Sequence, residues 1–211
     1  MKKKTNIIII IILSILLLIE ILLVKLDYFK IIDNFVYNII SQFINPTNTA
    51  IFKFFSFFGS EIFVITLSLL TLFLLKKKSR GVGFVFILLL SVLLNQGLKL
   101  LVSRPRPSIN PLVIENSYSF PSGHTMIIST IIGLFIFYLW ETKKGSKTKK
   151  IIITTFLAIV ALLVMISRIY LGVHYFSDII GGITATLLLF SIIYYYYSFK
   201  YKVPYFPKKT K

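Results

Sequence analysis

The chain has 211 residues, of which 56% are hydrophobic, and a formal net charge of +17 at pH 7. Soluble domains have about 45–50% apolar residues, so this composition, with a mean hydropathy of +0.86, favours a membrane protein. The basic residues lie in short clusters between apolar stretches, which argues against a nucleic-acid-binding surface. Because the chain has no cysteine, disulfides, thiolate catalysis and thiolate metal sites are excluded.

Six apolar stretches approach the length of about 20 helical residues that crosses the hydrocarbon core of a bilayer. They cover residues 6–24, 52–75, 82–102, 121–140, 151–168 and 177–197. The first stretch is longer than the apolar part of a secretory signal peptide and is not followed by a cleavage-site pattern. We therefore predict an all-α integral membrane bundle of six transmembrane helices that forms one domain, residues 1–211.

The segment between the first two spans has apolar residues at helical spacing from Tyr28 to Phe43, with polar residues on the other side. This pattern is typical of an amphipathic helix that lies on a membrane interface, and Pro46 would end it. We predict such a helix here. Anchoring is its simplest role, and a lid over a lipid site is the alternative.

The positions of Lys and Arg predict the orientation of the chain, because cytoplasmic loops are enriched in both residues. With both termini in the cytoplasm, most of the 24 basic residues lie in cytoplasmic segments. The exceptions are Lys25, Lys30, Lys53, Lys99, Arg104, Arg106 and Arg168. The first three can act as interfacial anchors, whereas topology gives no reason for the other four. We predict a multi-pass protein of the plasma membrane.

The four unexplained cations belong to three polar segments at the predicted outer boundary of the membrane, residues 99–107, 119–124 and 167–178. Guanidinium groups match phosphate oxygens in a bidentate manner, and the free N–H groups at the start of a helix favour an anion. The segments therefore predict a phosphate-binding site in which Lys99, Arg104, Arg106 and Arg168 supply positive charge and Ser122 and Gly123 begin a helix.

Both histidines of the chain lie in these segments. His174 and Asp178 are four residues apart, so on a helix they would share one face, where the carboxylate can fix the imidazole tautomer. His124 would then protonate the leaving oxygen. Each residue alone is equally compatible with a structural role, but together they predict a catalytic site on the outer membrane face. We expect neither a metal nor a cofactor, because no further metal-ligand cluster accompanies the histidines.

At these positions the sequence resembles the type 2 phosphatidic acid phosphatase family, whose signature is K-x6-R-P, P-S-G-H and S-R-x5-H-x3-D. Every fixed position of the signature is present, from Lys99 to Asp178. The resemblance implies that His174 attacks phosphorus to form a phosphohistidine, that Asp178 orients it, and that His124 protonates the leaving oxygen and then activates water. It also implies that the phosphate oxygens are held by Lys99, Arg106, Arg168, Ser122 and the backbone of Gly123. Arg104 lies outside the signature and is an additional candidate.

The resemblance implies a metal-independent lipid phosphatase that acts on undecaprenyl diphosphate, phosphatidylglycerol phosphate or phosphatidic acid. A site at the membrane boundary can hold the headgroup while the tails stay in lipid. The expected partners are therefore the bilayer and a lipid phosphate substrate, with no nucleic acid and no obligate protein partner. Two alternatives stay open, a lipid phosphotransferase with the same site and a non-catalytic lipid-binding membrane protein.

Overall fold

The computed structural model describes residues 3–74, 78–108, 110–142 and 145–200. Within these ranges the chain forms eight α-helices and a short π-helix and has no strand: α1 (Lys3–Lys25), α2 (Lys30–Ser41), α3 (Pro46–Phe57), α4 (Glu61–Leu74), α5 (Lys78–Val102), α6 (Gly123–Glu141), α7 (Lys147–Tyr170), α8 (Phe176–Tyr195) and η1 (Tyr196–Lys200). Five helices are long and apolar enough to cross a membrane, and the pair α3 and α4 makes a sixth span if counted together. The predicted all-α membrane bundle is confirmed.

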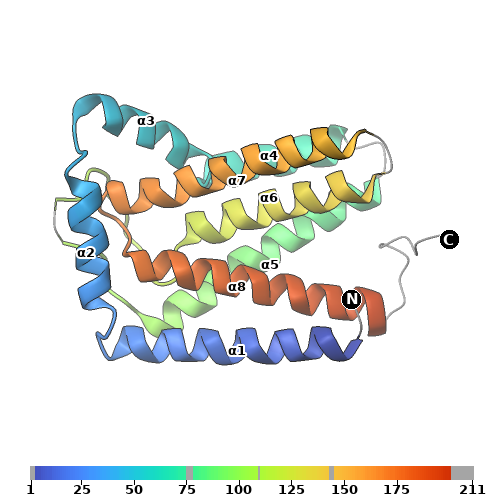
Figure 1. Ribbon diagram of the computed structural model, residues 1–211, viewed down its shortest axis with the longest axis horizontal. Coiled ribbons are helices and arrows are strands. Elements are labelled where there is room, and N and C mark those ends of the chain that lie inside the picture. Colours follow the sequence, from blue (N-terminus) through green and yellow to red (C-terminus); the bar gives the residue numbers. More distant parts are fainter. Residues whose placement is uncertain (1–2, 75–77, 109, 143–144, 201–211) are drawn as a thin grey trace.

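The long helices run side by side, and α2 lies across one end of the bundle (Figure 1). Helix α8 packs against α1 and α6, and α6 also packs against α5 and α7. Among the candidate spans, α8 and α6 have the largest buried shares, whereas α1 and α7 have the smallest. The two most buried spans, α6 and α8, therefore hold His124 and Asp178 of the predicted site.

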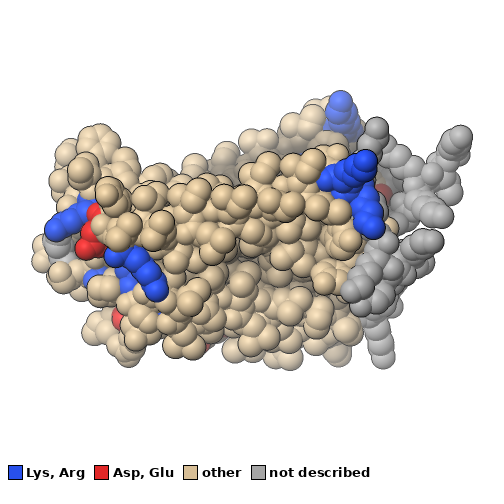
Figure 2. All heavy atoms as spheres, turned by 90° about the horizontal axis from the view of Figure 1, so that it is seen from below, with Lys and Arg blue, Asp and Glu red and all other residues tan. Residues whose placement is uncertain are grey.

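The outer helices expose large apolar side chains, among them Leu18, Phe73 and Phe156, each more than half exposed. Figure 2 shows Lys and Arg gathered at the two ends of the molecule, with other residues between them. A broad apolar belt between charged ends is the surface that a bilayer covers. Some lysines used to predict the orientation lie outside the described residues, among them Lys76, Lys77, Lys143, Lys144 and those after Lys200.

The second predicted span is not one continuous helix. Helix α3 begins at Pro46, and its N-cap residue Asn45 accepts a hydrogen bond from the backbone of Asn48. It ends at Phe57, and α4 continues after a turn with a bend of 41° between the two axes. The turn places Gly59 against His124, where a Cβ atom would lie 2.7 Å from the ring carbon Cδ2. The break thus lets the backbone pack directly on a predicted catalytic residue.

The predicted amphipathic helix is present as α2. Its apolar residues Ile31 and Phe35 are 84% and 59% exposed, whereas Asp33 is the one buried residue of this helix. Helix α2 packs on α7 and α8. The polar side of α2 therefore faces the protein at Asp33 instead of facing water.

Candidate active site

The three polar segments meet at the end of the bundle that α2 covers (Figure 1). Backbone hydrogen bonds join them: the N–H of Ser119 donates to the carbonyl oxygen of Arg104 at 2.9 Å, and the N–H of Ser122 donates to that of Asp178 at 3.0 Å. Segments far apart in the sequence are therefore held as one site between α5, α6, α7 and α8.

The side chains of His174 and Asp178 form a buried pair, with Nδ1 of the ring 3.2 Å from Oδ2 of the carboxylate. The pair does not lie along one helix face, as the four-residue spacing suggested. His174 lies in the turn before α8, and Asp178 is in the first turn of α8. There Oδ2 also accepts the backbone N–H of Tyr175 at 2.9 Å, which caps the helix. The helix cap therefore aims the carboxylate at the imidazole.

The second ring nitrogen of His174, Nε2, lies 3.2 Å from Nη1 of Arg106. A guanidinium only donates hydrogen bonds, so Nε2 accepts, and Nδ1 carries the proton that faces Asp178. Burial lowers the pKa of His174 well below its ordinary value, and the charges of Arg168, Arg106 and Lys99 lower it further. His174 is therefore a neutral imidazole in this arrangement, and the lone pair of its Nε2 points at Arg106.

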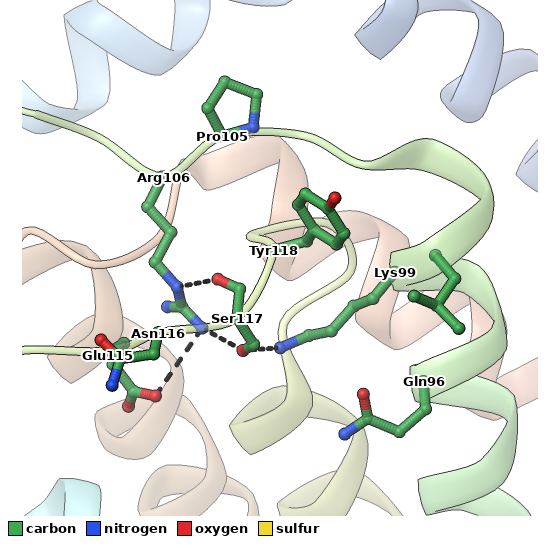
Figure 3. A pocket seen from close by; sticks show the side chains of 9 residues that line it. Gln96, Lys99, Pro105, Arg106, Glu115, Asn116, Ser117 and Tyr118 are labelled. Carbon is green, nitrogen blue, oxygen red and sulfur yellow. Dashed lines mark hydrogen bonds and ion pairs between the residues drawn. The ribbon is translucent and has the colours of Figure 1, made fainter.

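Lys99 and Arg106 converge on Ser117 (Figure 3). Its hydroxyl lies 2.8 Å from Nζ of Lys99 and 2.9 Å from Nη2 of Arg106, and its carbonyl oxygen accepts from Nε of Arg106 at 2.6 Å. Both cations line a cavity of about 560 Å³ together with Gln96, Leu100, Pro105, Glu115, Asn116, Ser117 and Tyr118. Ser117 therefore accepts hydrogen bonds from Lys99 and Arg106, the two residues predicted to donate to phosphate.

Arg168, at the end of α7, is 2% exposed and binds the Glu115 carboxylate through Nη2 at 2.5 Å. Its Nη1 donates to the hydroxyl of Ser56 on α3. Its Nε is buried and has no hydrogen-bond partner among the described residues. The other oxygen of Glu115 lies 3.7 Å from Nη2 of Arg106. Glu115 is therefore an internal counter-ion shared by two of the predicted phosphate ligands.

Helix α6 begins at Gly123, and its N-cap residue Ser122 is buried and accepts the N–H of Thr125 at 3.3 Å. A Cβ atom on Gly123 would lie 3.1 Å from Oδ1 of Asn95, so the backbone is closely packed there. The first N–H groups of a helix have no intrahelical acceptor and can receive an anion. His124 follows in the first turn, half-buried, against Gly59.

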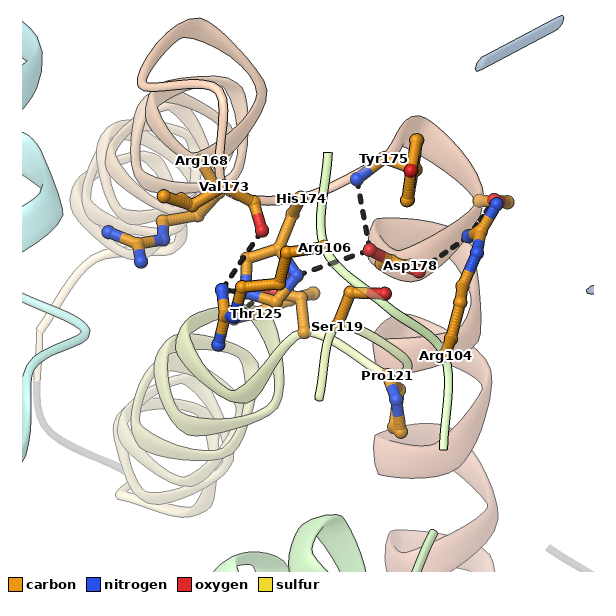
Figure 4. Close-up of polar contacts among 12 residues, drawn as sticks. Arg104, Arg106, Ser119, Pro121, Thr125, Arg168, Val173, His174, Tyr175 and Asp178 are labelled. Atoms are coloured by element: carbon orange, nitrogen blue, oxygen red, sulfur yellow. Dashed lines mark hydrogen bonds and ion pairs between the residues drawn. The ribbon is translucent and has the colours of Figure 1, made fainter. Parts of the chain in front are cut away.

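Arg104 lies apart from the other cations, on the far side of Asp178 from His174 (Figure 4). Its Nη1 donates to Oδ1 of Asp178 at 2.7 Å, and its Nη2 donates to Oδ2 of Asp33 at 2.8 Å. Its guanidinium also lies 3.9 Å from the ring centre of Tyr175. These contacts place Arg104 on two carboxylates and not in the cluster predicted to hold phosphate.

Among the described residues, no group of three or more His, Cys, Asp or Glu side chains could hold a metal ion. Metal independence itself stays a prediction that only an assay can test.

Comparison with known proteins identifies the family. The sequence profile of the PAP2 superfamily matches residues 80–202, which contain all three polar segments. The chain belongs to the PAP2 superfamily.

Named relatives of this PAP2 protein include two prokaryotic enzymes. It is 33% identical to phosphatidylglycerophosphatase B of Bacillus subtilis over 138 residues, which are 64% of this chain and 68% of that protein. It is 29% identical to undecaprenyl-diphosphatase of Sulfolobus acidocaldarius over 144 residues, which are 64% of each chain. The crystal structure of a transmembrane PAP2-type phosphatidylglycerolphosphate phosphatase from Bacillus subtilis aligns with a TM-score of 0.80 at 26% identity and covers 96% of this chain and 98% of that one.

Some residues that contact the site of this PAP2 protein lie outside its signature and were not predicted from the sequence, among them Glu115, Ser117 and Asp33. Glu115 and Ser117 bind the cations, and Asp33 binds Arg104. Glu115 is the one acidic residue in the segment 103–122, which is a signal that the sequence offered. Asp33 looks like any polar residue on an amphipathic helix, so its role becomes visible only in the structure.

Proposed function

We propose that this PAP2 protein hydrolyses the phosphate ester or anhydride bond of a membrane lipid, with His174 as the nucleophile. The observation that carries the proposal is the pair of hydrogen bonds made by the two nitrogens of the His174 imidazole. Its Nδ1 faces a buried carboxylate, and its Nε2 accepts a hydrogen bond beside a cluster of cations. A nucleophile held by a third group in this way follows the general pattern of covalent catalysis.

In the first step, Nε2 of His174 attacks phosphorus and the bond to the leaving oxygen breaks. The electron pair of that bond goes to the leaving oxygen, which takes a proton from His124. The product is a phosphohistidine and a lipid alcohol, or a lipid monophosphate if the substrate is a diphosphate. Asp178 stabilises the positive charge that the ring gains, because Nδ1 keeps its proton.

In the second step, His124 takes a proton from water and the water oxygen attacks phosphorus. The P–N bond breaks, its electron pair returns to His174, and orthophosphate leaves. The cations Lys99, Arg106 and Arg168, with Ser122 and the backbone of Gly123, hold the equatorial oxygens in both steps. Phosphoryl transfer depends mainly on such positioning and charge stabilisation. For phosphate to bind, it displaces Ser117 and Glu115 from these cations.

The substrate is a membrane lipid whose headgroup enters the cavity while its tails stay in the bilayer. The cavity of about 560 Å³ lies at one end of a bundle whose sides are apolar. The relatives' names support phosphatidylglycerol phosphate and undecaprenyl diphosphate as candidates, and phosphatidic acid is the third. The distribution of Lys and Arg supports a site on the outer face of the plasma membrane with both termini in the cytoplasm.

The test is orthophosphate release by protein purified in detergent with EDTA present, from the three candidate lipids, beside His174→Ala. We expect the wild type to release orthophosphate from at least one lipid without added metal, and the variant to release none. An acceptor alcohol added in a parallel reaction measures phosphotransfer. A folded wild type that is inert on all three lipids, or a His174→Ala variant as active as the wild type, would refute the proposal.

A further inference from the structure

Asp33 is a buried carboxylate that α2 places against the first turn of α8. It is 2% exposed, while its neighbours on α2 present large apolar side chains to the outside. Its Oδ1 accepts the backbone N–H of Ser177 at 2.8 Å, and its Oδ2 accepts the hydroxyl of Ser177 at 2.7 Å. Burying a carboxylate is costly unless hydrogen bonds and an opposite charge compensate it. The bonds of Asp33 therefore hold α2 at one fixed place on the site.

Arg104 supplies the opposite charge and joins two carboxylates that belong to different helices. One terminal nitrogen donates to Asp178 at 2.7 Å and to Ser177 at 2.8 Å, and the other donates to Asp33 at 2.8 Å. Burial opposes its charge, but the nearby carboxylates of Asp178 and Asp33 raise the pKa of Arg104 above its ordinary value. The planar guanidinium can reach both carboxylates at once, which an ammonium group cannot do with the same geometry.

The bond from Arg104 decides which oxygen of Asp178 faces the nucleophile. Arg104 occupies Oδ1, so Oδ2 is left to accept from Nδ1 of His174 and from the backbone of Tyr175. Because both oxygens are engaged, the carboxylate has no free rotation about its Cβ–Cγ bond. A continuous series of hydrogen bonds therefore runs from Asp33 on α2 through Arg104 and Asp178 to His174.

We propose that Asp33 and Arg104 are positioning residues for the phosphoryl transfer: they lock the carboxylate that orients the nucleophile and couple its geometry to the docking of the interfacial helix α2. The inference rests on the proposed function for its kinetic effects. It also has a consequence for the ionisation of His174 that is measured without turnover.

The two residues carry opposite charges, so their removal shifts the pKa of His174 in opposite directions. Loss of the cation in Arg104→Gln favours the imidazolium and raises the pKa of His174, whereas loss of the anion in Asp33→Asn lowers it. The other charged or titratable groups around His174 are unchanged in both variants: Asp178 on α8, Arg106 in the loop after α5, Arg168 on α7, Lys99 on α5 and His124 on α6. These shifts follow from the charges alone, so they test the placement of both groups beside Asp178 and His174, whereas the comparison of kcat with KM tests the positioning role.

The kinetic test compares Asp33→Asn, Arg104→Gln and Arg104→Lys with the wild type, using the lipid of the panel that the wild type hydrolyses fastest. We expect kcat to fall by about 10- to 100-fold, because small displacements of a reacting group cost rates of this order. We expect KM and the inhibition constant of orthophosphate to change by less than about threefold, since the cations that hold phosphate are intact. Arg104→Lys keeps the charge, so its kcat falls while the acid limb of its kcat/KM profile stays at the wild-type pH.

The ionisation test uses protein labelled with ¹³C-histidine, which gives two histidine resonances because the chain has only His124 and His174. We assign them with a His124→Asn variant and titrate wild type, Asp33→Asn, Arg104→Gln and Arg104→Lys. The control is Glu61→Gln, which also replaces a carboxylate by its amide, at an exposed position at the start of α4, and it should leave both kcat and the titration unchanged.

Each result decides the matter. An unchanged kcat in folded Asp33→Asn and Arg104→Gln, a raised KM with an unchanged kcat, or the absence of opposite pKa shifts would overturn the inference. If His174 titrates as expected while the wild type hydrolyses no lipid, the proposed function fails and the electrostatic arrangement stands. If the wild type is an active phosphatase and the variants equal it, only the positioning role fails. Arg104→Gln leaves two buried carboxylates without a cation and can fail to fold. In that case Arg104→Lys, which keeps the charge, still tests the kinetic effect of losing the guanidinium geometry.

Discussion

The carboxylate of Glu115 binds Arg168 at 2.5 Å. Arg168 is 2% exposed, so this ion pair is deeply placed although Glu115 itself is 30% exposed in its side chain. The second carboxylate oxygen lies 3.7 Å from Arg106. The carboxylate of Glu115 therefore pairs with Arg168 and Arg106, the same cations that bind the substrate phosphate in the proposed function.

Removing this internal anion should strengthen phosphate binding. We expect Glu115→Gln to lower the competitive inhibition constant of orthophosphate by about tenfold, equivalent to about 1.4 kcal/mol, because phosphate no longer competes with a carboxylate. Initial rates at several orthophosphate concentrations measure it. Glu61→Gln, which changes an exposed carboxylate at the start of α4, is the control. An unchanged or higher inhibition constant would show that Glu115 does not compete with phosphate.

The pH dependence of kcat/KM should reflect a neutral His174. The nucleophile is active only when deprotonated, and burial with the charges of Arg168, Arg106 and Lys99 holds the pKa of His174 well below its ordinary value of 6.5. On the acid side, activity should therefore decline only below the pH range in which an ordinary histidine titrates. On the alkaline side it should fall because His124 must carry the proton that the leaving oxygen takes, so the whole profile is bell-shaped. The ionisation of the lipid phosphate is measured by ³¹P NMR and corrected for. An acid limb centred at or above the ordinary value would contradict this account.

Replacing the orienting carboxylate should abolish most of the chemistry but not phosphate binding. Asp178→Asn keeps the shape of the side chain, but its NH₂ group donates and cannot accept, so Arg104 and His174 no longer each face an acceptor oxygen. We expect kcat to fall by about 10³- to 10⁴-fold, as an imidazole held in the wrong tautomer loses activity of this order. The inhibition constant of orthophosphate should stay within about threefold of the wild type. A variant with a raised inhibition constant and a normal kcat would assign Asp178 to phosphate binding instead.

The close packing of Gly59 on His124 predicts a selective effect on leaving-group protonation. A Cβ atom at Gly59 would lie 2.7 Å from Cδ2 of His124, so the ring must move in Gly59→Ala. We expect kcat to fall by about 100-fold for a lipid phosphate, whose leaving group is an alcohol, since general acid catalysis contributes on this scale. The fall should be smaller for p-nitrophenyl phosphate, whose leaving group needs no proton.

The matched control for this variant is Gly97→Ala on α5, where a Cβ atom would meet no atom within 4 Å. It should change neither rate by more than about twofold, because the added methyl group meets open space. Equal losses on both substrates in Gly59→Ala would indicate a general disturbance of the fold and not a displaced acid.

Hydropathy and charge spacing predicted the spans because a bilayer requires long apolar helices whatever their packing. The bend between α3 and α4 could not be predicted in this way, because an apolar stretch has the same hydropathy whether it forms one continuous helix or two helices joined by a turn. At the bend Gly59 packs against His124, a contact between two residues 65 positions apart that only the packed bundle brings together.

The residues of the signature were found because their types and spacing are unusual for a membrane boundary. The residues that contact the signature residues and Arg104 were not predicted, because Asp33 and Ser117 are common polar residues in segments where polar residues are expected. Arg104 shows the limit most clearly: its position beside Arg106 suggested a phosphate ligand, and its contacts with Asp33 and Asp178 give it a different environment.

The most direct test of the central claim is to trap the covalent intermediate. Wild-type protein is mixed with ³²P-labelled lipid substrate, quenched in alkali within one turnover and digested, and the labelled peptide is identified. We predict label on His174 that is stable in alkali and lost in acid, as a P–N bond requires, and no label in His174→Ala. Orthophosphate release by the wild type with no label on His174, or continued release by His174→Ala, would contradict the account.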